Sequence, residues 1–267
     1  MMAVTTSPAL DTGGVSDTSG VSDTGGVSDT SGVSDTDRSS SDDLASAALS
    51  LARCFGAGAT MWCVARQWPA HGRHVAVEFV HPVIVGTRAL PAVSVEGLDT
   101  VRTVRLLARP GDVLLVIGSA DDADTAELLR RAEAWGLTRI LLGAGPRPEG
   151  GHADHVVWLE GEDPGLASHS GDMVLLYHLL WELTHVVFEH PGLLAQAPQC
   201  TDEVCITCSD EGRVAEVRSL RPDGLVEVVV KGASEIIDTS LVGPVAPGDL
   251  LLVHAGVALT SVEESGP

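Results

Sequence analysis

The chain contains one clear βαβ pattern, in residues 111–142. Five consecutive aliphatic residues, Val113–Ile117, form a run that is typical of a buried parallel strand. A turn leads to an amphipathic helix at Ala123–Trp135, which Gly136 ends, and Arg139–Leu142 is the next strand. Because consecutive parallel strands are joined by right-handed crossovers, this region predicts an α/β fold with a parallel sheet.

Further elements alternate in the same way on both sides of this unit. We expect helices at 44–54, 71–85 and 171–189, and strands at 60–65, 91–95 and 155–159. Asp42 or Asp43 can cap the first helix, and Pro82 must kink or end the second. Helices on both faces of such a sheet predict a three-layer α/β sandwich.

After Pro198 the pattern changes to short strands with no helix between them. The expected strands are 213–220, 225–230, 236–242, 250–254 and 257–262, and a Pro-Asp-Gly turn separates the first two. Five short strands in succession predict a small OB-like β-barrel. The expected organisation is a tail at 1–43, an α/β domain at 44–197 and a barrel domain at 198–267.

The tail consists largely of hexapeptide repeats of Asp, Thr, Gly, Ser and Val between Asp11 and Ser34. Such repeats cannot bury enough apolar surface to offset their ordering entropy, so we expect this segment to be disordered. It holds a net charge of −7 out of the −21 of the whole chain, and the barrel domain holds −8.

The acidic composition excludes several classes of protein. A nucleic-acid binder needs a basic surface, and so does a protein that docks on anionic lipid. The sequence has no apolar run long enough for a membrane helix and no signal-peptide pattern at its start. Five cysteines, an odd number, do not form a disulfide framework. We therefore expect a cytoplasmic protein with free thiols.

The barrel sequence carries two motifs of a known family. Cys205-Ile-Thr-Cys208-Ser-Asp precedes a Gly-Arg-Val-Ala-Glu-Val strand, and Gly248–Gly256 reads Gly-Asp-Leu-Leu-Leu-Val-His-Ala-Gly. With these motifs the domain resembles the HypC/HupF family of [NiFe]-hydrogenase maturation chaperones. The resemblance implies that Cys205 is the functional thiol, with His254 as a second contact and Cys208 beside it.

The same resemblance implies a cargo and partners. The cargo would be an iron fragment with cyanide and carbonyl ligands, carried transiently through Cys205. A thiolate is a soft ligand that suits such iron, and imidazole is a natural second donor. The implied partners are a HypD-like scaffold protein and the hydrogenase large-subunit precursor.

The α/β sequence resembles a sugar isomerase (SIS) domain of the phosphoheptose-isomerase type. The residues that carry this resemblance are Leu114–Gly118, the run Ala132–Leu142, and the pair His74-x3-Glu78. The family binds zinc through a His-x3-Glu pair and a histidine on a late helix. This implies zinc ligands at His74 and Glu78, with His178 as the third ligand and His185 as an alternative, and it also implies a homo-oligomer.

The phosphate-binding loops of that family are poorly matched. Ser119 could bind a ligand, but Asp121 and Asp122 lie where a phosphate dianion would sit, and like charges repel there. The domain is therefore expected to lack isomerase activity.

Together these patterns predict an accessory chaperone of hydrogenase maturation that hands over iron through Cys205. The alternative is a zinc-dependent, sugar-phosphate-isomerase-like enzyme that acts through the α/β domain, and a third hypothesis is a structural adaptor without metal.

Overall fold

The α/β domain is built on a five-stranded parallel sheet with the strand order β2-β1-β3-β4-β5. In this computed structural model the described residues are 35–82, 86–97, 99–119, 122–148, 153–160, 171–194 and 212–262. The five strands are β1 (Met61–Val64), β2 (Ala92–Val95), β3 (Val113–Ile117), β4 (Thr138–Ala144) and β5 (His155–Leu159). The fold class predicted from the sequence is confirmed for this domain.

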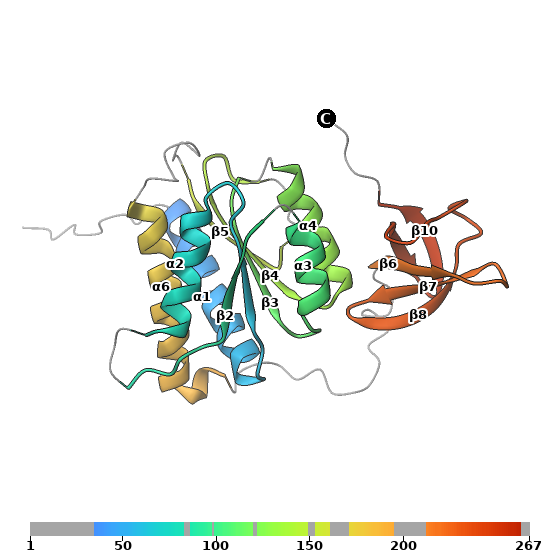
Figure 1. Ribbon diagram of the computed structural model, residues 1–267. Coiled ribbons are helices and arrows are strands. Elements are labelled where there is room, and N and C mark those ends of the chain that lie inside the picture. Colours follow the sequence, from blue (N-terminus) through green and yellow to red (C-terminus); the bar gives the residue numbers. More distant parts are fainter. Residues whose placement is uncertain are drawn as a thin grey trace, which may run out of the picture. The chain divides into compact units, whose positions relative to one another are not determined.

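Helices cover both faces of the sheet (Figure 1). One face carries α1 (Asp35–Gly56), α2 (Pro69–Val80) and α6 (Gly171–Glu189), and the other carries α3 (Thr100–Leu107) and α4 (Ala123–Ala134). A short 3-10 helix, η1 (Pro191–Leu193), follows α6. Among the described helices, none has both the length and the apolar composition that a membrane crossing requires.

Strand β3 shows why an uninterrupted aliphatic run indicates a central strand of the sheet. Val113, Leu115 and Ile117 pack with the α1, α2 and α6 side of the core. Leu114 and Val116 pack with the α3 and α4 side. Because alternate side chains of a strand point to opposite faces, a central strand with helices on both sides must be apolar at every position.

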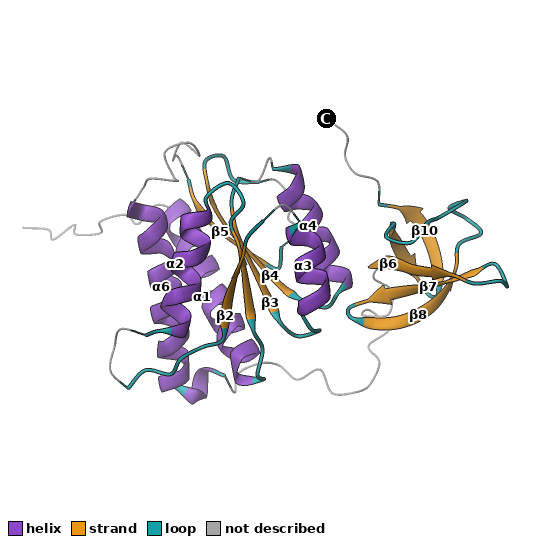
Figure 2. Ribbon diagram, viewed as in Figure 1, coloured by secondary structure: helices purple, strands orange, loops and turns teal. Residues whose placement is uncertain are grey.

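The C-terminal domain is a closed barrel with the strand order β10-β8-β7-β6-β9 (Figure 2). Its strands are β6 (Arg213–Leu220), β7 (Leu225–Val230), β8 (Ala233–Asp238), β9 (Leu250–His254) and β10 (Val257–Ser261). Neighbouring strands are antiparallel except β8 and β10, which meet in parallel at Asp238 and Val257. The barrel has its own apolar core, which includes Val217, Val228 and Leu251.

Two helices differ from the prediction. Helix α1 begins at Asp35, ahead of the predicted caps at Asp42 and Asp43, so it crosses the boundary expected between tail and domain. The repeats themselves lie outside the described residues. Helix α2 ends at Val80, just before Pro82, as the missing proline N–H requires.

Helix α3 was not predicted at all. It spans eight residues and buries only Thr100 and Val104, so its apolar periodicity is too brief to recognise in the sequence. Its start is fixed by Asp99, whose side chain accepts a hydrogen bond from the Arg102 backbone N–H at 3.0 Å.

Candidate functional site

A cluster of metal-binding side chains lies where α2 faces α6. Helix α2 places His74 and Glu78 one turn apart, and α6 brings His178 to the same point. Glu78 Oε1 lies 3.2 Å from His74 Nε2 and 3.4 Å from His178 Nε2. Each residue offers one ligand atom, and these three atoms lie within 4.8 Å of one another. The structure therefore brings together three of the four zinc ligands that the sequence suggested.

The chemistry of these donors fits zinc. Two imidazole nitrogens and one carboxylate oxygen form a common three-ligand set that leaves a further coordination position open. The Nε2 atom of His178 is buried and makes no hydrogen bond to any described residue. A buried polar atom without a partner is unfavourable, and a bound cation would supply one. The carboxylate of Glu78 is only 17% exposed, whereas the imidazoles of His74 and His178 are 41% and 38% exposed.

Tyr177 and His71 extend the cluster behind His74. The Tyr177 hydroxyl lies 2.8 Å from His74 Nδ1 and 3.4 Å from His71 Nδ1. Burial, together with the nearby negative charge of Glu78, raises the pKa of Tyr177 to about 12, so this hydroxyl keeps its proton. When Tyr177 donates to His71, it can accept from His74 Nδ1–H, and this tautomer leaves the lone pair of His74 Nε2 for a cation bound beside Glu78.

His185, the alternative zinc ligand, lies apart from this cluster. Its side chain is buried, with Nδ1 2.9 Å from the Trp181 carbonyl and Nε2 3.0 Å from the Arg88 carbonyl. Both ring nitrogens therefore face backbone oxygens. This histidine connects α6 to the segment before β2, a structural role that the helical spacing did not reveal.

The expected phosphate loop lies at the carboxyl end of β3, and the chain's own side chains bind its donors. The Ser119 backbone N–H donates to Gln67 Oε1 at 3.1 Å. Asp122 caps α4, accepting from the Thr125 N–H at 2.9 Å and from its hydroxyl at 2.6 Å. A carboxylate thus occupies the helix N-terminus at which an anion would bind, and Asp121 lies outside the described residues.

The residues expected to contact iron belong to the barrel domain. Cys205 and Cys208 lie outside the described residues. His254 is the last residue of β9, is part-buried, and precedes a turn at Ala255 and Gly256, both with positive φ. Among the described cysteines, Cys54 and Cys63 are free thiols, as the odd cysteine count predicted.

Sequence reasoning missed the two residues that support the cluster. His71 precedes His74 by three positions and therefore lies near the same face of α2, and Tyr177 is adjacent to His178. Helical spacing could therefore have indicated both residues. Their role depends on how α2 packs against α6, which the sequence does not state.

The barrel domain matches a known family in its sequence. Residues 211–266 match the HupF/HypC family. One similar protein is the hydrogenase maturation factor HypC of Rhizobium leguminosarum bv. viciae, which is 38% identical over 48 residues. That match spans 18% of this chain and 64% of the length of that protein. The resemblance stated from the sequence is confirmed for this domain.

The solved structures similar to this chain include two that are named as isomerases and the sugar isomerase domain of a transcription factor. One is a phosphoheptose isomerase from Francisella tularensis, with a TM-score of 0.46 and 16% identity, covering 54% of this chain and 86% of that one. A putative sugar-phosphate isomerase from Listeria monocytogenes has a TM-score of 0.43 and 14% identity. That match covers 59% of this chain and 83% of the isomerase chain. The sugar isomerase domain of an RpiR transcription factor from Sphaerobacter thermophilus has a TM-score of 0.40 and 14% identity. That match covers 59% of this chain and 90% of that domain's chain. At these scores no functional residue is carried over to this chain.

Proposed function

We propose that this protein is an accessory chaperone of [NiFe]-hydrogenase maturation. The observation that carries the proposal is the HupF/HypC match of residues 211–266, which covers all five strands of the barrel. The 48-residue similarity to a hydrogenase maturation factor supports it further.

In the proposed mechanism Cys205 binds an iron fragment and passes it to the large-subunit precursor. The thiolate is the soft ligand, and His254, at the end of β9, is the second contact. Two ligands hold the cargo less firmly than a closed four-ligand site would, so transfer remains fast. The expected partners are a HypD-like scaffold and the precursor of the hydrogenase large subunit.

Affinity capture of the full chain from cells that assemble a hydrogenase tests this proposal. We expect the wild-type protein to retain both partners and to show cyanide and carbonyl infrared bands. Cys205→Ala should lose the bands, whereas Cys54→Ala, which removes a thiol of the α/β domain, should keep them. Wild-type protein that captures neither partner and carries no such iron would overturn the proposal.

We also propose that His74, Glu78 and His178 hold a zinc ion in the α/β domain. The support is the donor set and the buried Nε2 of His178, which lies 3.4 Å from Glu78 Oε1 but forms no hydrogen bond within the described part of the chain. Zinc bound there would supply a Lewis acid with an open coordination position. Tyr177 would fix the tautomer of His74 through its 2.8 Å contact with Nδ1.

The zinc-dependent isomerase that the sequence offered as an alternative is not favoured. At the end of β3, Gln67 and Asp122 bind the backbone donors that a phosphate group would need. A second carboxylate, Asp124, pairs with Arg66 at 2.7 Å and so neutralises the cation of the neighbouring loop. We therefore expect no phosphosugar turnover by the purified protein with zinc bound.

The α/β domain is also proposed to form a homo-oligomer. On α6, Leu175, Leu179 and Val186 are exposed at spacings that place them near one face of the helix. Val186 also lines a groove of about 370 Å³ that is formed by mostly apolar residues of α1, α6 and η1. A second copy of this chain is the proposed occupant, and light scattering of wild type and Leu179→Glu measures it.

A further inference from the structure

One carboxylate of the barrel, Glu216, faces the α/β domain. On β6, Ala215 and Val217 point into the barrel core, so Val214 and Glu216 point outward. Val214 packs against the α3 and α4 side of the α/β core, and the side chain of Glu216 is only 12% exposed. The outer face of β6 is therefore in contact with the other domain.

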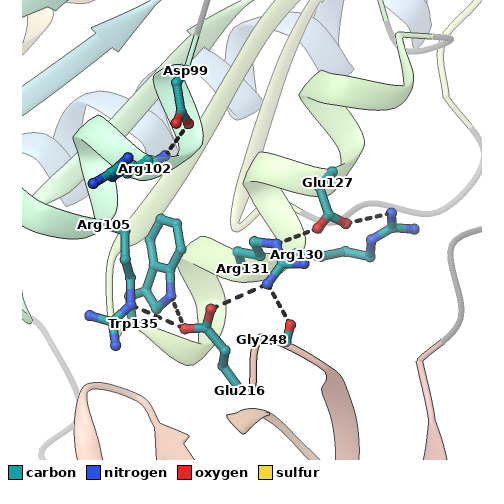
Figure 3. A network of polar contacts seen from close by, with 9 residues as sticks. All are labelled: Asp99, Arg102, Arg105, Glu127, Arg130, Arg131, Trp135, Glu216 and Gly248. Atoms are coloured by element: carbon teal, nitrogen blue, oxygen red, sulfur yellow. Dashed lines mark hydrogen bonds and ion pairs between the residues drawn. The ribbon is translucent and has the colours of Figure 1, made fainter. Parts of the chain in front are cut away.

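Three donors, from α3, α4 and the residue that caps α4, surround this carboxylate (Figure 3). Arg105 Nε lies 3.1 Å and Trp135 Nε1 lies 2.5 Å from Glu216 Oε2. Arg131 Nη1 lies 3.2 Å from Oε1 and also donates to the Gly248 carbonyl at 2.7 Å. Charge-assisted hydrogen bonds of this kind are among the stronger polar contacts in proteins.

A second contact between the domains includes a backbone hydrogen bond. The turn between β7 and β8 lies against the end of α4, where the Gly232 N–H donates to the Ala134 carbonyl at 2.8 Å. A Cβ placed on Gly136 would lie 2.6 Å from the Lys231 carbonyl oxygen, and one on Gly232 would lie 2.3 Å from Pro110 Cγ. Both glycines also have positive φ, so this close approach requires glycine at the two positions.

Opposite charges meet at this contact, where the Glu216 carboxylate pairs with Arg105 and Arg131. Arg131 also pairs with Glu127 of its own helix α4, so this one arginine links carboxylates of both domains.

We propose that α3 and α4 form a docking site for the barrel, with Arg105, Arg131 and Trp135 acting as a clamp on Glu216. The strand register shows which part of the barrel the clamp engages. Glu216 pairs with Leu250 and Arg213 pairs with Val253, so His254 lies at the opposite end of this ladder. At about 3.3 Å per residue, His254 is roughly 13 Å along β9 from Leu250. The clamp therefore engages the barrel away from His254, and the turn at Ala255 and Gly256 that follows His254 is exposed.

Amide hydrogen exchange on the full chain tests the clamp. In Glu216→Arg we expect the amides of Gly232 and of the Glu216 segment to exchange at least roughly tenfold faster, since charge-assisted bonds are lost. Adding Arg131→Glu should restore part of the protection, because the charges are then exchanged. The matched control is Glu227→Arg, which makes the same change of charge in the barrel. Glu227 accepts hydrogen bonds from the hydroxyls of Ser219 and Ser234, both within the barrel.

Amides in the middle of β7 report whether the barrel remains folded in each variant. Unchanged exchange at Gly232 in Glu216→Arg, with β7 protected, would overturn the proposal, and so would an equal increase in Glu227→Arg. The clamp is proposed within one chain, so protection that disappears on dilution of the wild-type protein also contradicts it.

Discussion

Two part-buried glutamates, on opposite sides of the α/β sheet, face different kinds of base. Glu78, on α2, lies between the imidazoles of His74 and His178. Glu216, on β6 of the barrel, lies between the guanidinium groups of Arg105 and Arg131, beside α3 and α4. Their side chains are similarly buried, at 17% and 12% exposure.

The difference between the two bases decides what each glutamate can do. Arginine stays protonated at every pH that a protein tolerates, so Glu216 has its counter-charge built in and serves to hold two domains together. Imidazole changes its protonation near neutral pH and offers a lone pair when neutral. Glu78 therefore belongs to a cluster that a cation can complete.

The largest effect is expected for zinc binding. His178→Ala removes one of three ligands, and we expect the affinity for zinc to fall by at least about a hundredfold. Competition with a chromophoric chelator measures this. His190→Ala removes an exposed histidine just after α6 and should leave the affinity unchanged. Equal affinities in all three proteins would refute the site.

A smaller effect is expected for the barrel contact. Glu216→Ala leaves two guanidinium groups without their shared partner, and we expect a loss of about 1–3 kcal/mol in the free energy of unfolding. Urea titration followed by tryptophan fluorescence is suitable, because Trp135 contacts Glu216. Zinc affinity should stay unchanged in this variant. A fall in zinc affinity would show that the two sites are coupled.

Tyr177→Phe distinguishes support of the site from direct ligation. Loss of the hydroxyl removes the contact with His74 Nδ1, and we expect about a tenfold loss in zinc affinity. The same chelator competition measures it, with circular dichroism to show that α6 is intact. A loss as large as that of His178→Ala would mean that Tyr177 is itself a ligand.

The smallest effect concerns an imidazole away from both sites. Burial lowers the pKa of His155, and Asp154 and Asp43 offset this only in part. The folded state therefore binds its proton less readily than the unfolded state, so stability should fall as the pH drops below about 6.5. His155→Gln should flatten the decline between about pH 7 and pH 5 in thermal unfolding. An unchanged pH profile would contradict this role.

The sequence could predict the elements that repeat a pattern over many residues. The aliphatic run at Val113–Ile117 and the alternating strands after residue 212 determined a parallel sheet followed by a barrel. In these elements the spacing of residues along the chain decides which side chains are buried, so the burial pattern can be read from the sequence. Helix α3 has too few buried positions for such a pattern, so it was missed although it carries Arg105.

The ligand cluster was only partly predictable for a related reason. Helical spacing placed His74 and Glu78 on one face, because residues four apart are neighbours within one helix. Choosing between His178 and His185 requires the rotation of α6 against α2, and the structure places His178 at Glu78 and His185 against backbone carbonyls.

By itself the sequence determined the two fold types, the HupF/HypC character of the barrel and the His-x3-Glu pair, because each depends on residues close together in the chain. Tertiary structure alone decided the contacts of Glu216 with Arg105, Arg131 and Trp135, which lie between 81 and 111 positions away. It also decided the place of Tyr177 behind His74, 103 positions away. Such contacts depend on how separate elements pack, and no local periodicity encodes that packing.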